Sequence, residues 1–520
     1  MDMSKISKEI IKKKSYERGI IVSTVLNILA KLIVFLNTIV ITYYFGTQIE
    51  TDIYYYVIIV TTLICSSING IDLLVLIPEI MRLRQQESES DARQFTNFFI
   101  FLYILIGFLF AMLIMINPIN FYSTFSKFDT EKLERYELML NIGIGIIFFQ
   151  LINSFLSSVL TSYKFFISPI LANIVNSLFT ILFTFFFHSH LGIKATLLGV
   201  LLGYVINFVI LTLTLRFQLH WRFTDFSLMK NVVVWKNIGL MQLNFFPVWL
   251  RSYISILLLS EMATGTITAL NIAQNVAAIP EAFIVTQVVA IIGIKFSELN
   301  ALSDFITLKN LLNNVLISLL LLIIPVAIVF GVCSKDIISI LYLRGGFDSQ
   351  ALANTSFCLV YLSILMPSKI PDALFTRLFT SLQLYKVTVF SATLAHIIIS
   401  TLTYFLTTKF GISGYFWTLL IGYWVIMPIV YFLIIFFKAK TFRSFIVLKN
   451  LAYISIITSL VTTVAYYNYS YNHSVPYINL IVTIIIVIIP FWLLSYYTLD
   501  IEPIKIILRN FFFKIKVYKK

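Results

Sequence analysis

Charged residues are scarce in this 520-residue sequence, because Asp, Glu, Lys and Arg together make up only 12% of it. A typical soluble domain carries about 25% charged residues. Hydrophobic residues make up 59% of the chain and form long uninterrupted runs. So few charges exclude an ordinary soluble protein. The sequence therefore predicts a polytopic membrane protein whose helices face lipid.

Cysteine is scarce as well, and the chemistry-bearing motifs of enzymes are missing. The three cysteines, Cys65, Cys333 and Cys358, lie too far apart to indicate a disulfide framework or a zinc site. His188 and His190 lie at one helix end without a third ligand, so they are interpreted as interfacial. No Gly-rich phosphate loop or nucleophile elbow occurs. We expect neither an enzyme nor a cofactor nor a metal site.

Long hydrophilic connections are also missing, so no soluble domain is expected to fold alone. Hydropathy gives about fourteen spans of roughly 20 residues or more. The predicted fold class is an all-α polytopic membrane protein with two pseudo-symmetric six-helix lobes and two C-terminal helices. Residues 1–217 form the expected N-terminal lobe and 218–234 an interfacial linker helix. Residues 235–440 form the C-terminal lobe, and 441–520 the last two helices with a basic cytoplasmic tail.

Lys and Arg outnumber Asp and Glu by 38 to 24, and the excess is unevenly placed. It gathers before the first span, in alternate connections and after the last span. This alternation follows the positive-inside rule and predicts that both termini are cytoplasmic. The basic excess is therefore assigned to topology and to contact with anionic membrane lipids, not to nucleic acid.

Two cations interrupt the apolar spans, where a charge costs roughly 2.5–3.5 kcal/mol. Lys31 and Arg251 are expected to face one hydrated cavity and to bind an anionic substrate there. The amides of Asn37, Gln274 and Asn275 are expected to contribute hydrogen bonds to the same substrate.

Acidic residues within the spans offer an alternative reading of these cations. Asp72 and Glu281 could neutralise Lys31 or Arg251 across neighbouring helices. A second expectation concerns a single helix, on which Lys369 and Asp372 lie three residues apart and should pair with each other. Several prolines and the Asn69-Gly70 pair also interrupt spans, and kinked helices suit a transporter that alternates between two openings.

Several motifs keep the order and spacing of a known family. They are Phe45-Gly46-x-x-x-x-Thr51-Asp52, the Gly70 to Pro78 segment, Ala263-Thr264-Gly265 followed by Ala273 and Pro280, Leu341-Tyr342-Leu343-Arg344-Gly345-Gly346-Phe347-Asp348, and Arg377-x-Phe379-x-Ser381-Leu382. Together they resemble the MurJ/MviN family of lipid II flippases in the MOP exporter superfamily. Structural or gating roles are expected for Asp52, Arg344, Asp348, Lys369, Asp372 and Arg377.

This resemblance implies two lobes around a cationic central cavity, with a groove for a lipid tail along the last two helices. It implies alternating-access transport of an undecaprenyl-pyrophosphate-linked glycan precursor across the bacterial cytoplasmic membrane. An ion gradient, of H⁺ or Na⁺, or the membrane potential would drive it. The implied partners are the lipid-linked glycan, membrane lipids, the coupling ion and enzymes of cell-wall or polysaccharide synthesis.

The sequence departs from the family at most of its cationic positions. Lys31 keeps one charge, whereas Asn37-Thr38, Ile64-Cys65 and Gln274-Asn275 replace the family's charged pairs. Arg251 has no counterpart in the family pattern. The cargo therefore stays open between lipid II and another lipid-linked unit, such as a capsular or O-antigen precursor.

Two other functions remain as alternatives. A cation-coupled exporter of drugs or small metabolites could share the same fold, and Asp72 with Glu281 would be its candidate acidic pocket. A polysaccharide polymerase or ligase would need a sizeable external loop with catalytic residues. The absence of such a loop disfavours the enzyme.

Overall fold

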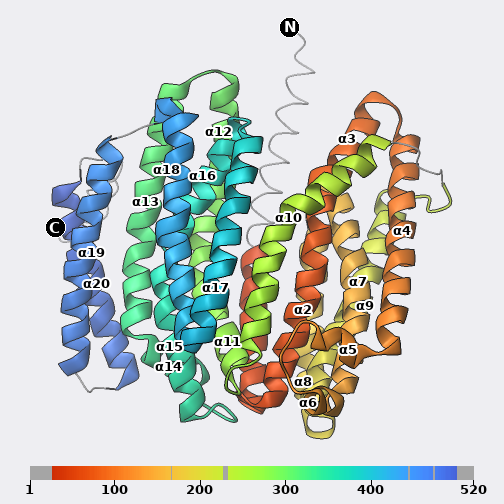
Figure 1. The fold of residues 1–520 in the computed structure, drawn as a ribbon, viewed down its shortest axis with the longest axis horizontal. Helices are drawn as coiled ribbons and strands as arrows, with labels where there is room; N and C mark the ends of the chain where they lie inside the picture. The colour runs from red at the N-terminus through yellow and green to blue at the C-terminus, as the bar shows by residue number, and fades with distance from the viewer. Residues whose placement is uncertain (1–25, 166, 226–231, 443–444, 472–474, 500–520) are drawn as a thin grey trace, which may run out of the picture. The chain divides into compact units, whose positions relative to one another are not determined.

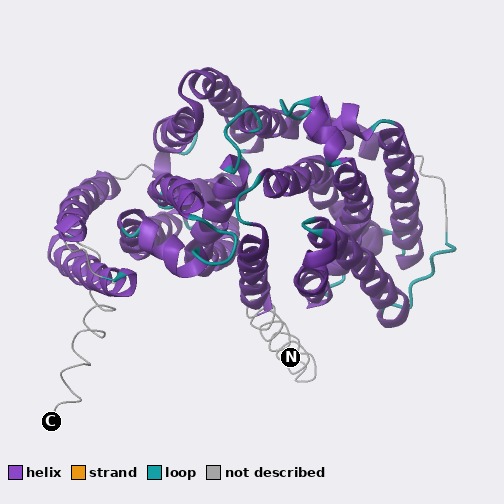
Figure 2. Ribbon diagram, turned by 90° about the horizontal axis from the view of Figure 1, so that it is seen from below, coloured by secondary structure: helices purple, strands orange, loops and turns teal. Residues whose placement is uncertain are grey.

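The computed structural model describes residues 26–165, 167–225, 232–442, 445–471 and 475–499. These residues are almost entirely helical, and no strand occurs among them (Figures 1 and 2). The chain divides into two compact units, residues 1–268 with 345–347, and residues 269–344 with 348–520. The predicted all-α class is confirmed.

The first unit begins, within the described residues, with the helix Leu26–Phe45. It continues with α2 (Ile49–Ile71), η1 (Asp72–Leu76), α3 (Ile77–Gln86), α4 (Glu89–Ile116), α5 (Pro118–Ser123), α6 (Thr130–Arg135), α7 (Glu137–Ser162), α8 (Ile167–Leu191), α9 (Lys194–Gln218), α10 (Val232–Leu259) and the first residues of α11 (Thr266–Glu281).

The second unit takes the remainder of α11 and the helices that follow. They are η2 (Ala282–Thr286), α12 (Gln287–Ala301), α13 (Phe305–Val332), α14 (Ser334–Tyr342), α15 (Ser349–Leu365), α16 (Lys369–Ser381), α17 (Tyr385–Ile421), η3 (Gly422–Ile426), α18 (Met427–Phe437), η4 (Lys440–Phe442), α19 (Phe445–Tyr471) and α20 (Pro476–Thr498).

Eleven helices among the described residues are long and apolar enough to cross a membrane, or twelve if α15 and α16, bent by 42°, form one span. The expected number of fourteen is therefore not confirmed. One of the eleven, Lys386–Phe437, has 52 residues, which at 1.5 Å per residue far exceeds the roughly 30 Å of hydrocarbon. Gly411 breaks it with φ 58° and ψ −140°, between the spans that hydropathy predicts at 384–408 and 412–437.

The expected linker helix, 218–234, is described only in part. Residues 219–225 are not helical, and residues 226–231 lie outside the described part. Trp221 is 1% exposed, because its indole N–H donates to the Asn97 side chain of α4 at 2.8 Å. The same Asn97 amide donates to the carbonyls of Arg222 and Asp225. This segment is thus folded onto the helix core, whereas an interfacial helix would lie at its rim.

The expected boundary between lobes stays a prediction. α10, expected to open the C-terminal lobe, belongs to the first unit, where it packs against α2 and η1. Gly70 permits this approach, because a Cβ on it would lie 2.1 Å from the Phe245 ring of α10. The sequence around Gly70 therefore codes for a close helix crossing.

Three single-turn π-helices, η1, η2 and η3, interrupt the long helices of the described chain. The first follows Asn69-Gly70 and the second follows Pro280, so both lie close to the predicted interruptions. A π-turn inserts an extra residue and is frequent at functional sites. All three cysteines are free and buried in the structure. Cys65 and Cys358 lie in predicted apolar spans, where a buried thiol is expected.

Candidate functional site

Asp52, near the start of α2, holds the beginning of α11. One carboxylate oxygen accepts the Gly265 N–H at 2.6 Å. The other accepts the N–H and the hydroxyl of Thr268 at 2.9 and 2.6 Å. Because the first N–H groups of a helix lack internal partners and carry partial positive charge, a carboxylate stabilises them. Asp52 is 3% exposed, and the geometry is that of a structural cap.

The segment 345–347 of the first unit lies against the end of the helix Leu26–Phe45. The Gly346 N–H donates to the Tyr43 carbonyl at 2.7 Å. Gly345 has φ +61°, and a Cβ on Gly46 would lie 2.1 Å from the Gly346 carbonyl oxygen. Only glycine fits such an approach of two backbones. This is the physical content of the Phe-Gly and Arg-Gly-Gly motifs.

The two charged residues that flank this segment cap helices of the second unit. The exposed Arg344 guanidinium donates to the Leu341 carbonyl at the end of α14, at 2.8 Å. Asp348 accepts the Ala351 N–H at 2.8 Å and so caps α15. Both contacts are local, and neither tests the expected gating role.

Lys31 and Asn37 lie on the helix Leu26–Phe45, a candidate span. Lys31 is exposed, and it makes no ion pair or hydrogen bond to a described residue. The side-chain oxygen of Asn37 is buried and accepts no hydrogen bond within the described ranges. The alternative in which a fixed acid neutralises Lys31 therefore finds no partner among the residues of known placement.

Arg251 lies on α10 and is half-buried. On the same helix Trp249 and Tyr253 stack with ring centroids 5.4 Å apart, and the Tyr253 hydroxyl donates to the Thr124 carbonyl at 2.8 Å. That Lys31 and Arg251 share one hydrated cavity stays a prediction. On α11 of the second unit, Gln274 is exposed, whereas the Asn275 amide approaches Asn271 at 3.4 Å.

The second unit contradicts the expected pairing of Lys369 with Asp372. The Lys369 ammonium lies 2.7 and 2.9 Å from the two carboxylate oxygens of Glu281 at the end of α11. Asp372 instead accepts the hydroxyl of Tyr431 from α18. The expectation was wrong because helices packed beside α16 bring partners closer than its own next turn does. Glu281 thus has its ion-pair partner within the second unit.

Asp72 pairs with neither Lys31 nor Arg251. It is fully buried at the start of η1, and the Tyr103 hydroxyl donates to it at 2.6 Å. Arg377 on α16 is exposed, and its side chain passes Gly293, where a Cβ would lie 3.1 Å from the Arg377 Cδ.

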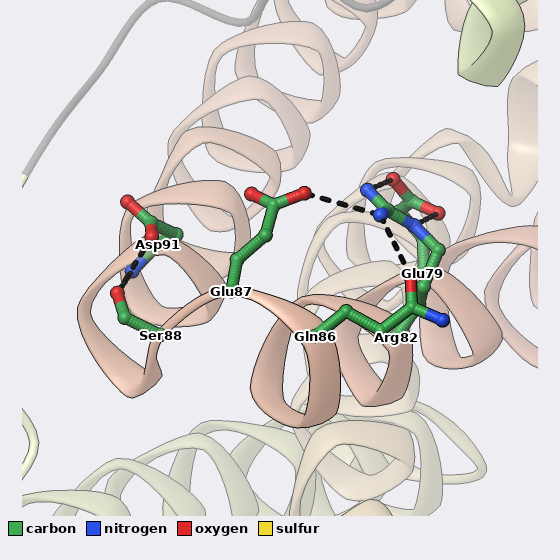
Figure 3. A network of polar contacts seen from close by, with 6 residues as sticks. All are labelled: Glu79, Arg82, Gln86, Glu87, Ser88 and Asp91. Atoms are coloured by element: carbon green, nitrogen blue, oxygen red, sulfur yellow. Dashed lines mark hydrogen bonds and ion pairs between the residues drawn. The ribbon is translucent and has the colours of Figure 1, made fainter.

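The turn between α3 and α4 carries a charge network that sequence reasoning missed (Figure 3). Arg82 binds both oxygens of Glu79 at 2.8 and 2.9 Å and one oxygen of Glu87 at 3.1 Å. These carboxylates raise the pKa of Arg82. The spacing of three residues could have identified the Glu79 pair. Glu79 is thus neutralised on its own helix.

Two pockets lie among the described residues. An apolar pocket of about 240 Å³ in the second unit lies between α13, α14 and α20; its lining residues are Val329, Phe330, Ile337, Ile340, Leu341, Leu480 and Ile484. A polar pocket of about 300 Å³ in the first unit includes Asp52 and the Lys127–Glu261 and Lys132–Asp129 ion pairs. Its lysines already have carboxylate partners, so it offers no free cation. No metal-ligating cluster occurs in the described part of the chain.

Comparison with known proteins identifies the relatives of this architecture. Residues 41–488 match the family described as lipid II flippase MurJ. A solved lipid II flippase MurJ in an inward closed conformation has 18% identity and TM-score 0.75, and the match covers 92% of this chain and 98% of that one.

More distant solved structures share the fold. An inward-facing multidrug resistance MATE family transporter of the MOP superfamily has 12% identity and TM-score 0.62, with 81% and 95% of the two chains covered. A MOP superfamily transporter from Pyrococcus furiosus has 10% identity and TM-score 0.58, with 82% and 97% covered. Identities this low establish the fold alone. Among curated proteins no sequence match was found.

Proposed function

This chain belongs to the lipid II flippase MurJ family, and on that premise we propose that it flips an undecaprenyl-pyrophosphate-linked glycan precursor across the bacterial cytoplasmic membrane by alternating access. The cargo is lipid II or a related surface-polysaccharide unit. Both termini are placed in the cytoplasm on the distribution of Lys and Arg. Partner enzymes are those that make or consume the lipid-linked glycan.

The observation that carries the proposal is Lys31. An ammonium group within a span costs several kcal/mol unless an anion or water compensates it, and no described carboxylate does so. A passing pyrophosphate would supply the missing negative charge. A charge-assisted hydrogen bond contributes about 1.5–3 kcal/mol, which holds a phosphate without trapping it. Arg251 on α10 is proposed as the second cation.

Other groups of the protein match the polyprenyl tail and the sugars of the cargo. The apolar pocket between α13, α14 and α20 suits a polyprenyl tail, because the side chains that line it are aliphatic or aromatic. The amides of Asn37, Gln274 and Asn275 match sugar hydroxyls, which both donate and accept hydrogen bonds. Amides replace charged residues of the family at Asn37, Gln274 and Asn275. This replacement favours a cargo that the protein recognises by hydrogen bonds to sugar hydroxyls.

Alternating access needs helices that change shape, and the chain contains suitable joints. They are the π-turns η1, η2 and η3, and the 42° bend between α15 and α16. We do not propose the drug exporter, because Glu281, one half of its expected acidic pocket, is already paired with Lys369.

The test is translocation in proteoliposomes that contain a fluorescent lipid-linked glycan, with lipid II and an O-antigen precursor compared side by side. Lys31→Ala should slow flipping about tenfold or more, since each 1.4 kcal/mol of lost binding is a factor of ten. Lys31→Arg should retain activity because it keeps the charge. Lys409→Ala is the matched control, since this exposed lysine lies over the Phe410 ring, 5.4 Å from its centroid, and forms no ion pair with a described residue. Wild-type rates in Lys31→Ala would remove the proposed site.

A further inference from the structure

Asp72 has no role in the proposed substrate site, and its surroundings are unusual for a carboxylate. It opens the π-turn η1 of the first unit and is 0% exposed. Its Oδ1 accepts the Tyr103 hydroxyl of α4 at 2.6 Å. Its Oδ2 is buried and has no hydrogen-bond donor among the described residues. One oxygen is thus satisfied and the other is bare.

Among the described side chains, no cation of its own continuous helix or of α4, where Arg93 is the basic residue, forms an ion pair with this carboxyl. On α3, Glu79 binds Arg82, and Arg84 binds Glu89 of α4. From α4 the titratable group that reaches the carboxyl is the neutral phenol of Tyr103. The acids of α2, Glu50 and Asp52, lie in its first turn, about six turns before η1.

The other elements packed against η1 are α7 and α10. The charged residue of α7, Glu137, lies in its first turn. α10 carries Lys236 and Arg251, and Asp72 forms no ion pair or hydrogen bond with either of them. Among the side chains that the structure describes, Asp72 therefore has a single polar partner, and that partner is uncharged.

The second unit provides an internal contrast. Glu281 immediately precedes the π-turn η2, much as Asp72 opens η1. Glu281, however, has the Lys369 ammonium within 2.7 Å. Among the described residues of the first unit, no cation forms such a pair with Asp72. Since an isolated carboxylate in an apolar interior costs far more than its neutral form, a buried carboxyl without a partner takes up a proton instead.

We propose that Asp72 is a proton-binding site of the first unit. Its Oδ2 carries a proton while the carboxyl is buried beside Tyr103. When the continuous helix α2–η1–α3 rearranges at its π-turn, the O–H bond gives its proton to water, and the resulting carboxylate keeps the Tyr103 hydrogen bond. Because a π-turn contains one extra residue, the helix can bend at η1 with the loss of few backbone hydrogen bonds. This inference goes beyond the proposed function.

The first test needs no substrate, so it is independent of the flippase proposal. Infrared spectra of the purified full chain in lipid nanodiscs should contain a protonated-carboxyl band at neutral pH that shifts in D₂O. Asp72→Asn should lose that band while it keeps an acceptor for Tyr103. Glu281→Gln is the matched control and should retain the band, since its carboxylate is ion-paired. An unchanged band in Asp72→Asn, or a band removed by Na⁺ at constant pH, would overturn the proposal.

A second variant covers the case in which Asp72→Asn does not fold. Tyr103→Phe removes the donor to Oδ1 but leaves the carboxyl, so the band should move to higher frequency and persist. A band of unchanged frequency would assign it to another carboxyl and overturn the site.

A transport experiment tests whether the protein uses this proton. A pH gradient should change the flipping rate of wild type and not of Asp72→Asn. Equal responses would refute proton use by Asp72, whereas no flipping in either would refute the flippase proposal alone.

Discussion

At the residue scale, the described charges fall into compensated and uncompensated groups. Glu79, Glu281 and Lys369 each have an ion-pair partner within 3 Å. Lys31 and Asp72 have none among the described residues. A fixed ion pair joins helices, whereas an uncompensated group within a span needs something that arrives from outside. The two proposals made here rest on this difference.

Replacement of Asp52 should lower the free energy of unfolding of the first unit, because its carboxylate accepts three hydrogen bonds. Asp52→Ala leaves two N–H groups and one hydroxyl near the start of α11 without their acceptor. We expect a loss of about 2 kcal/mol and a lower melting temperature in detergent. Asp129→Ala is the control, because Asp129 is 72% exposed and pairs locally with Lys132. Equal melting of the two variants would argue against the cap.

Side-chain partners show where sequence reasoning reaches its limit. The Glu79–Arg82 pair follows from a spacing of three residues on one helix. The Lys369–Glu281 pair joins residues 88 positions apart, so it depends on how α11 and α16 pack. The burial of Trp221 depends in the same way on Asn97 of α4. Composition predicts an interfacial tryptophan there, and only the packed helices reveal the hydrogen bond that buries it.

At the element scale, hydropathy located the long helices well, because lipid requires every backbone group to bond within its own helix. The break at Gly411 lies between two predicted spans. The π-turns were not predictable in type, although Asn69-Gly70 and Pro280 marked the positions nearby. The short α14 and the non-helical segment 219–225 depend on tertiary contacts that periodicity does not encode.

Glycine contacts allow a matched pair of variants at this scale. Gly46→Ala would place a Cβ 2.1 Å from the Gly346 carbonyl oxygen at φ +60°, so we expect impaired folding and a marked loss of properly inserted protein. Gly239→Ala meets nothing within 4 Å in α10 and should be neutral or stabilising by about 0.5–1 kcal/mol. Monodisperse yield in size-exclusion chromatography measures both. Normal yield of Gly46→Ala would show that the two backbones separate readily.

At the scale of the whole molecule, the chain is a multi-pass membrane protein of the MurJ family with two compact units. The motifs that indicated this family mostly form glycine contacts and helix caps. They therefore indicate the fold and say little about the cargo. The family's cationic positions, which would report the cargo, are the ones this sequence has largely exchanged for neutral residues.

Energy supply can be tested at this scale. Moving negative charge outward across an inside-negative membrane yields about 2.3 kcal/mol per charge per 100 mV. In potassium-loaded proteoliposomes with valinomycin, a potassium-free medium sets an inside-negative potential and equal potassium on both sides abolishes it. Abolishing the potential should therefore slow the flipping of a pyrophosphate-linked cargo. The same treatment without ionophore is the control. A rate that does not respond would exclude the potential as the driving force.

The burial of Cys65, Cys333 and Cys358 has a practical consequence for mapping this molecule. Burial raises the pKa of the Cys333 thiol to about 11, so almost none of it is thiolate at neutral pH. The natural chain should therefore react little with sulfhydryl reagents. Single surface replacements such as Lys409→Cys and Lys440→Cys can be read in intact cells with an impermeant maleimide, without first stripping the native thiols.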